Sequence, residues 1–347
     1  MAARALTVGI CVPTVREDAI RDFLSAWSPY WQTEPGSPLA VRLFVHEDRP
    51  RKTFDLRTLN ALTIRHTAHD DITSELHSRE WIIPRGSGAC RSFPMYLAWK
   101  AGCDYVITMD DDCHPEGGRG RQFLHDHLKS FERDRWFRTI SGDEPRGIPY
   151  QALGRLAVRV NHGLWTDVPD LDSPTALVRM REAKPVALRR GHEVIPPGMA
   201  FPLCAMNVCY HRDVMPAAYN LLMGLESEGL DRFDDIWSGL LIKRVLDYMG
   251  WYATSGEPFV RHLKKSNAFT NLRKEALGIQ IHEQLWEYIL DTPLQPGMTL
   301  CGAYLALAGR LRRFPEAFPA LPCPAGYFPR LADAMVSWVE LFEEPRQ

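Results

Sequence analysis

The sequence lacks the signatures of several protein classes. It has no run of about 18 apolar residues, so no membrane span is predicted. No cationic start leads into an apolar stretch, so no secretory signal is expected and the predicted location is the cytoplasm. The 41 lysines and arginines nearly balance the 43 aspartates and glutamates. The resulting net charge of −2 gives no electrostatic reason to expect nucleic acid or an anionic membrane as a partner.

Common catalytic and redox motifs are also missing. The twelve histidines include no HExxH or HxxxH spacing, so nothing in the sequence supports a zinc hydrolase. Neither Gly-x-Ser-x-Gly nor a Walker A motif occurs, so a nucleophile elbow and a P-loop are not expected. The eight cysteines form no CxxC pair, and a chain of 347 residues does not need disulfides to build a core. Reduced and mostly buried thiols are therefore predicted.

Short apolar runs alternate with helical patterns in the first third of the chain. Residues 6–12, 41–45 and 105–109 are brief and contain many β-branched side chains, as buried strands do. Apolar side chains recur with helical spacing over residues 20–27, and a second helix is expected over 94–102 because proline suits a first helical turn. This alternation predicts an α/β fold with a mostly parallel sheet flanked by helices.

The remainder of the chain gives weaker patterns. Residues 115–122 are rich in glycine and are expected to form a flexible loop. Long loops and short strands are expected over 145–210, a helix over 235–249, and mainly helices in the last 60 residues.

Three consecutive aspartates, Asp110, Asp111 and Asp112, directly follow the strand expected at 105–109. Side chains at i and i+2 of a strand leave on the same side, so Asp110 and Asp112 can converge while Asp111 points away. Two converging carboxylates repel each other unless a cation lies between them, and hard oxygen ligands suit Mg²⁺ or Mn²⁺ bound to a diphosphate. A solvated acidic turn or a helix N-cap is the alternative.

Two further groups could contribute to such a site. Asp234 and Asp235 precede the helix expected at 235–249, where an aspartate can equally serve as a helix cap. His262 follows a short predicted strand and could complete a metal site, and Lys264 and Lys265 could contact phosphate oxygens.

Arginines next to glycine-containing turns are candidates for anion binding. Residues 86–91 form a turn of small residues that ends in Arg91, where backbone N–H groups and a guanidinium could hold a phosphate. Arg155 and Arg159 follow a Gly-Ile-Pro-Tyr segment, and an ordinary surface charge is the alternative for each of them.

Taken in order along the chain, these motifs resemble the reversibly glycosylated polypeptides, known in plants as UDP-arabinopyranose mutases. The segments that carry the resemblance are 87–91, 110–113, 146–150, 162–165, 168–175, 201–207, 232–239, 262–267 and 331–336. The resemblance covers roughly residues 84–286 together with the last of these segments.

The resemblance implies a glycosyltransferase-A-like fold that binds a nucleotide-diphosphate sugar with Mn²⁺ or Mg²⁺. It also implies interconversion of the pyranose and furanose forms of that sugar without flavin. On this basis residues 1–270 are expected to form the nucleotide-sugar-binding catalytic domain, and residues 271–347 a helical C-terminal extension. A homo-oligomer is expected.

Carried over by position, the resemblance implies a role for each candidate residue. Asp110, Asp112 and His262 would bind the metal. Asp234 and Asp235 would lie at the sugar, where Arg155 or Arg159 could hold the sugar or the diphosphate. The residues expected to contact the nucleotide and its diphosphate are Pro13, Thr14, Arg16, Glu47, Asp48, Arg91, Asp111, Lys264 and Lys265.

Several alternatives stay open at this point. Leu153 occupies the position where the plant proteins have their self-glycosylated arginine. Bacterial relatives in antibiotic pathways are thought to act on GDP-sugars, so the substrate could be UDP-L-arabinose or a GDP-L-galactose-like sugar. The rival functions are a glycosyltransferase with a nucleotide-sugar donor and a noncatalytic or self-glycosylating sugar-binding subunit.

Overall fold

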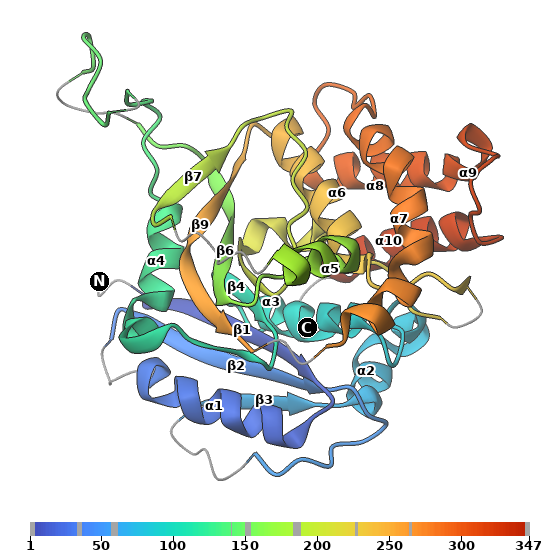
Figure 1. Cartoon of the computed structure of the whole chain (residues 1–347), viewed down its shortest axis with the longest axis horizontal. Helices are drawn as coiled ribbons and strands as arrows, with labels where there is room; N and C mark the ends of the chain where they lie inside the picture. Colours follow the sequence, from blue (N-terminus) through green and yellow to red (C-terminus); the bar gives the residue numbers. More distant parts are fainter. Residues whose placement is uncertain are drawn as a thin grey trace.

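A computed structural model describes residues 4–32, 37–56, 62–139, 141–149, 154–182, 189–225, 228–263 and 266–343. Within these residues a nine-stranded sheet is flanked by helices (Figure 1). Along the sheet the strands follow the order β3-β2-β1-β4-β8-β6-β9-β5, and β7 pairs with β9. The strands are β1 (Leu6–Thr14), β2 (Leu39–Glu47), β3 (Ile64–Thr67), β4 (Tyr105–Met109), β5 (Cys113–Pro115), β6 (Val158–Asp167), β7 (His192–Ile195), β8 (Asn207–His211) and β9 (Tyr252–His262).

Most strands of the sheet run in the same direction. The first four are mutually parallel, and β8 lies antiparallel to both β4 and β6. Strand β9 is parallel to β6, whereas β5 and β7 are antiparallel to β9. Six of the nine described strands therefore point one way, and the mostly parallel α/β fold expected from the sequence is confirmed.

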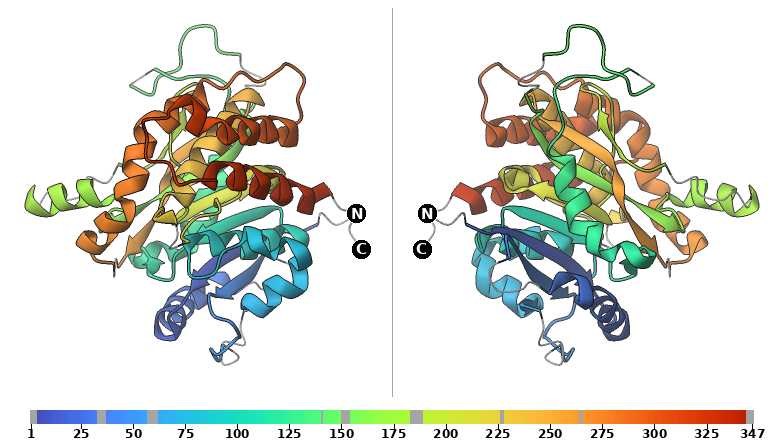
Figure 2. Two further views of the ribbon diagram at one scale, coloured as in Figure 1. Left: turned by 90° about the vertical axis from the view of Figure 1, so that its right-hand side faces the viewer. Right: turned by 90° about the vertical axis from the view of Figure 1, so that its left-hand side faces the viewer.

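Helices pack on both faces of the sheet (Figure 2). The α-helices are α1 (Glu17–Trp31), α2 (His69–Leu76), α3 (Ser92–Lys100), α4 (Phe123–Ser130), α5 (Ser173–Glu182), α6 (Asp234–Tyr248), α7 (Ala268–Leu290), α8 (Leu300–Arg312), α9 (Phe314–Ala317) and α10 (Tyr327–Glu343). Among the described residues, the 3-10 helices include η1 (His77–Ile82), η2 (Gly88–Arg91), η3 (Gly117–Gln122) and η4 (Arg212–Ala217).

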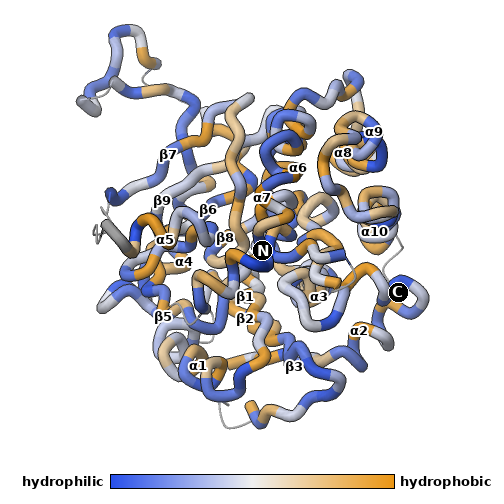
Figure 3. The backbone as a smooth tube through the Cα atoms, turned by 45° about the vertical axis from the view of Figure 1, so that its right-hand side comes forward, coloured by the Kyte–Doolittle hydropathy of each residue, from blue (hydrophilic) through white to orange (hydrophobic). Residues whose placement is uncertain are grey.

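The alternation of side chains along β1 divides the interior into two hydrophobic clusters. Val8, Ile10 and Val12 pack into one cluster with α1, while Cys11 faces the other cluster with α3. The absence of a side chain at Gly9 lets α3 pack closely against β1, because a Cβ added at Gly9 would lie 2.8 Å from the Cβ of Ala98 in α3. The colouring in Figure 3 shows apolar stretches along β1 and β2, and a largely hydrophilic excursion between α4 and β6.

The C-terminal helices pack on the same cluster as α3 and α6. Trp338 of α10 is fully buried, and its indole N–H donates to the carbonyl oxygen of Met215 in η4 at 3.2 Å. The helices beyond residue 270 thus continue one hydrophobic core. The division into domains at that residue stays a prediction.

The middle of the sequence contains helices and strands that its weak hydrophobicity pattern did not predict. Residues 115–122 are not a loop, because β5 ends at Pro115 and η3 covers Gly117–Gln122. The segment 145–210 contains the ten-residue strand β6, which lies between β8 and β9. The sequence of β6 does not read as an apolar strand because the polar residues Asn161 and His162 are buried in it. The side chain of Asn161 is satisfied there because it donates to the backbone oxygen of Glu257 at 2.9 Å.

Candidate functional site

A cavity of about 450 Å³ opens at the carboxyl ends of the central parallel strands. Thr14 at the end of β1, Asp48 after β2 and Asp110 after β4 all line it. Ligands of open α/β sheets characteristically bind at this edge. Among the residues that the structure describes, the lining includes ten carboxylates, Asp48, Asp110, Asp111, Asp112, Asp170, Asp172, Asp231, Asp234, Asp235 and Glu275, and four cationic side chains, Arg16, Arg91, Arg232 and Lys274.

Arg91 fixes the first aspartate of the triplet. Its turn begins at Ser87, whose hydroxyl oxygen accepts from the N–H of Ala89 at 3.1 Å. The guanidinium donates to the hydroxyl of Thr108 at 2.8 Å and forms a salt bridge with Asp110. Burial alone would raise the pKa of Asp110, but the charge and hydrogen bond of Arg91, together with more distant positive groups, outweigh burial, so the pKa lies below its ordinary value. Asp110 is therefore a carboxylate at neutral pH.

Replacing Arg91 by methionine is expected to lower the free energy of unfolding, because it leaves the Asp110 carboxylate without its counter-ion. The expected loss is about 2–3 kcal/mol, less than for a fully buried pair because the Asp110 side chain is 36% exposed. Urea denaturation measures this change. Arg138, which pairs with Glu144 on the surface, is the matched control, and Arg138→Met is expected to change stability by less than about 0.5 kcal/mol. Equal losses in both variants would contradict the anchoring role.

Asp112 and His262 form the second part of the site. The pairing of β5 with β9 brings His262 opposite Cys113, and the Nε2 atom of His262 lies 3.7 Å from an Asp112 oxygen. The Nδ1 atom lies 2.8 Å from the carbonyl oxygen of Val168 and donates to it, so Nε2 is the ring nitrogen left to face Asp112. Burial and then the charge of Asp110 raise the pKa of Asp112. A cation between these groups would relieve that repulsion.

The donor set of this group fits Mn²⁺ or Mg²⁺. Carboxylate oxygens are the preferred ligands of both ions, and Mn²⁺ also accepts an imidazole nitrogen. Asp110, Asp112 and His262, the three metal ligands expected from the sequence, lie at the same edge of the sheet. The residues present are thus suited to hold the ion.

Asp111 turns away from the other two aspartates, as expected. Its carboxylate accepts from the hydroxyl of Thr14 at 2.6 Å and forms a salt bridge with Arg16. A terminal nitrogen of Arg16 also lies 3.7 Å from Asp112. Asp111 therefore ties the end of β1 to the acidic triplet and directs a guanidinium along the cavity wall.

The acidic pair at the start of α6 forms the opposite wall. Asp235 accepts from the N–H of Ala205 at 3.0 Å, which fixes its orientation. Asp234 approaches the η2 turn so closely that a Cβ added to Gly88 would lie 3.0 Å from its Oδ2 atom. Burial and then the charge of Asp235 raise the pKa of Asp234 to about 7. Asp234 can therefore gain or lose a proton near neutral pH.

Some expected site residues lie away from the cavity. Glu47 is buried and accepts from the N–H groups of Thr53 and Phe54 at 2.9 and 3.2 Å, so it stabilises the turn after β2. Arg155 lies 3.9 Å from Glu132. Lys264, Lys265 and Leu153 lie outside the described residues.

The two arginines expected at the sugar are not brought to the cavity edge. Arg159 lies 3.7 Å from Asp213, and its guanidinium stacks on Trp251 at 5.0 Å. Both Arg155 and Arg159 lie at the amino end of β6, whereas the cavity is at the carboxyl ends of the parallel strands.

A cluster not expected from the sequence connects three helices around the cavity. Glu275 of α7 accepts from the side chain of Arg232 at 2.8 Å and from the N–H of Ser173 at 2.7 Å. It thereby joins the loop before α6 to the start of α5. Arg232 and Ser173 belong to segments that carry the family resemblance, but Glu275 lies within a long helix without any local motif.

The whole chain is similar to known proteins. The family model described as "Reversibly glycosylated polypeptide" matches residues 4–347. The chain belongs to this family. UDP-arabinopyranose mutase 1 of Arabidopsis thaliana is 31% identical over 355 residues, which cover 96% of this chain and 92% of that protein. The probable UDP-arabinopyranose mutase 2 of Solanum tuberosum is 32% identical, with 96% and 89% coverage.

A more distant likeness connects this family member to a solved structure. A mannosyltransferase from Pyrobaculum calidifontis, in complex with GDP-Man and Mn²⁺, covers 99% of this chain and 89% of its own. The TM-score is 0.44 and the identity 13%. Among the described helices, none combines the length and the apolar character that crossing a membrane requires.

Proposed function

We propose that this family member is a metal-dependent mutase that interconverts the pyranose and furanose forms of a nucleotide-diphosphate sugar without flavin. The observation that carries the proposal is the meeting of two different acidic groups in one cavity. Asp110 and Asp112 can hold a cation, and Asp234 can exchange a proton. UDP-L-arabinose is the favoured substrate because the plant relatives are named UDP-arabinopyranose mutases.

Ring contraction requires the bond between the anomeric carbon and the diphosphate to break. Asp110, Asp112 and His262 would hold a divalent cation, which would supply Lewis-acid stabilisation of the departing diphosphate. Arg16 and Arg232 line the same cavity and can donate to phosphate oxygens. Arg91 acts indirectly, because its guanidinium already holds Asp110.

The pair at the start of α6 is proposed to handle the cationic sugar and its hydroxyl proton. Asp235 is oriented by the N–H of Ala205 and can stabilise positive charge on an oxocarbenium-like sugar. Asp234, with a pKa of about 7, accepts the proton of the sugar hydroxyl whose oxygen bonds to the anomeric carbon to close the new ring. The bond between the anomeric carbon and the old ring oxygen then breaks, and Asp234 returns the proton to that oxygen. The same diphosphate then attacks the anomeric carbon again, so no second substrate is required.

The proposal is tested by incubating the purified protein with UDP-arabinopyranose and Mn²⁺ alone and separating the ring forms by chromatography. The expected result is a furanose product without any acceptor. Release of free sugar or UDP, or a product only when an acceptor is added, would instead support the glycosyltransferase. No product without a second protein, followed by activity on its addition, would support the noncatalytic subunit.

A thermal-shift panel distinguishes the two candidate nucleotides, UDP and GDP. With Mn²⁺ present, UDP at about 100 times its dissociation constant is expected to raise the melting temperature by about 5 °C. GDP at the same concentration is the matched comparison and is expected to shift it less. A larger shift with GDP would assign the protein to the GDP-sugars, and no shift with either would contradict nucleotide binding.

A further inference from the structure

A second group of metal-ligating side chains lies beside the cavity, at the end of β2. His46 is completely buried, and its Nδ1 atom lies 3.2 Å from the hydroxyl of Thr67. That hydroxyl donates its own hydrogen to the carbonyl oxygen of Val45 at 3.3 Å, so it accepts from the Nδ1–H of His46. The Nε2 atom of His46 is therefore the unprotonated nitrogen.

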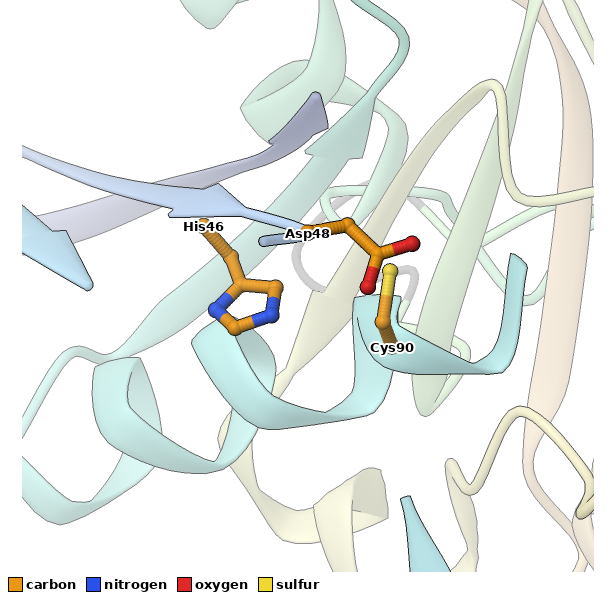
Figure 4. Close-up of side chains that lie close together, drawn as sticks. All are labelled: His46, Asp48 and Cys90. Carbon is orange, nitrogen blue, oxygen red and sulfur yellow. The ribbon is translucent and has the colours of Figure 1, made fainter. Parts of the chain in front are cut away.

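This nitrogen is aimed at two other ligand atoms. Nε2 of His46 is buried and makes no hydrogen bond with the part of the chain that the structure describes. In Figure 4 the imidazole ring turns this atom toward Asp48 and Cys90. A ring nitrogen of His46, a carboxylate oxygen of Asp48 and the sulfur of Cys90 all lie within 4.8 Å of one another. An unpartnered buried nitrogen thus faces a carboxylate and a thiol.

The carboxylate of Asp48 is held in place by its surroundings. Its Oδ1 atom contacts the Nε2 atom of His69 and accepts from the N–H of Gly86 at 3.2 Å. Its Oδ2 atom receives no hydrogen bond from a described residue and stays available as a ligand. One oxygen thus orients the group and the other can bind, which is the usual arrangement of a carboxylate ligand supported by outer hydrogen bonds.

The chemistry of these three atoms selects the type of ion. Thiolate, imidazole and carboxylate together are typical ligands of zinc, whereas Mg²⁺ and Ca²⁺ take oxygen ligands. Zinc–ligand bonds of about 2.0–2.3 Å place tetrahedral ligand atoms about 3.3–3.8 Å apart, so the three atoms need to close by at most about 1.5 Å. Zinc would also displace the thiol proton of Cys90.

We propose that His46, Asp48 and Cys90 form a zinc site, separate from the cation site of Asp110, Asp112 and His262. Asp48 and Cys90 line the cavity whereas His46 does not, so the ion would lie at the wall of the cavity. The ion would join the end of β2 to η2, the turn that carries Arg91. Zinc would thereby hold the arginine that anchors Asp110.

The first test uses the unaltered protein and needs no enzyme assay. Protein purified without chelator is expected to contain one zinc ion per chain by elemental analysis. After exchange of zinc for Co²⁺, a near-ultraviolet charge-transfer absorption between thiolate and cobalt is expected, because Cys90 supplies a sulfur ligand. A protein that takes up neither ion, or a cobalt form without the thiolate absorption, would overturn the proposal.

Variants then locate the ion. His46→Gln and Cys90→Ser are each expected to weaken zinc binding by about 10-fold or more and to remove or reduce the cobalt absorption. Cys204→Ser is the matched control, because Cys204 also lines the cavity and its sulfur lies 3.7 Å from the Nε2 atom of His162. Zinc retained by both test variants, or lost with Cys204→Ser, would contradict the assignment.

A further variant separates this site from the one proposed for catalysis. Asp112→Asn is expected to lose Mn²⁺ binding and to retain zinc with its thiolate absorption. If zinc were lost together with Mn²⁺ in this variant, the zinc would belong to the Asp112 site and the proposal would be wrong. The zinc measurement therefore stands even if the mutase activity is absent.

Discussion

Asp112→Asn is expected to lower kcat for ring interconversion about 100- to 1,000-fold, the usual cost of removing one group that stabilises transition-state charge. The variant is also expected to bind Mn²⁺ more weakly. Both effects follow from the position of Asp112, which lies beside Asp110 and 3.7 Å from the Nε2 atom of His262. Chromatographic assays at increasing Mn²⁺ concentration, together with Mn²⁺ binding by electron paramagnetic resonance, measure the two effects separately.

The same substitution is expected to stabilise the metal-free protein. Burial and the charge of Asp110 raise the pKa of Asp112, so an ionised carboxylate at this position costs folding energy when no cation is bound. Asp213→Asn serves as a control, because Asp213 lies on η4 outside the cavity. Full activity and an unchanged Mn²⁺ requirement in Asp112→Asn would contradict the metal site.

Asp234→Asn is expected to lower kcat at least about 100-fold, the usual contribution of a positioned acid or base. In the unaltered protein kcat is expected to rise with pH through about 7, because the carboxylate form of Asp234 accepts the proton. This step in the pH profile is expected to disappear in the variant. A wild-type rate or an unchanged profile in Asp234→Asn would contradict the proton transfer.

Asp234 also links stability to pH. An aspartate has a pKa near 4 in an unfolded chain, and burial with the neighbouring Asp235 raises the pKa of Asp234 to about 7 in the folded protein. The native state thus favours the protonated form, and this contribution to stability is present below pH 4 and lost as the pH rises to 7. Asp234→Asn is therefore expected to gain about 2–4 kcal/mol in stability relative to wild type between pH 4 and pH 8.

Urea denaturation at both pH values measures that gain. Asp18→Asn is the control, because Asp18 is exposed on α1 and its replacement is expected to have the same small effect at each pH. A gain of equal size in the two variants would show that the pH dependence does not come from Asp234. Asp234→Asn is thus expected to be less active but more stable than wild type, because the Asp234 carboxylate serves catalysis and destabilises the fold.

The parts of the site that follow rules of local geometry were predictable from the sequence. Asp110 to Asp112 come directly after a short apolar strand, and the i, i+2 rule separates Asp111 from its neighbours. Local geometry did not predict the different positions of Glu47 and Asp48. Both follow the same apolar run, but Glu47 turns into the protein and only Asp48 reaches the cavity. Which of two adjacent carboxylates faces a ligand depends on the turn that follows the strand.

Other residues were not predictable because their positions depend on long-range pairing. Arg155 and Arg159 lie next to a glycine-containing turn, but the direction of β6 carries them to the opposite end of the sheet from the cavity. Glu275 contacts Arg232 and Ser173 only because α7 packs beside α5 and α6. His262 could be proposed as a ligand, but its contact with Asp112 requires the antiparallel pairing of β5 with β9.

The excess of carboxylates over cationic side chains in the cavity makes the two ligands of the proposed reaction mutually dependent. A nucleotide sugar would bring further negative charge into an acidic cavity, so its affinity is expected to be low until a divalent cation has been bound. Thermodynamic reciprocity then requires that the nucleotide sugar strengthen cation binding by the same factor. We therefore expect substrate and cation to bind as a cooperative pair, with the concentration of the free ion setting the fraction of the protein that holds its nucleotide sugar.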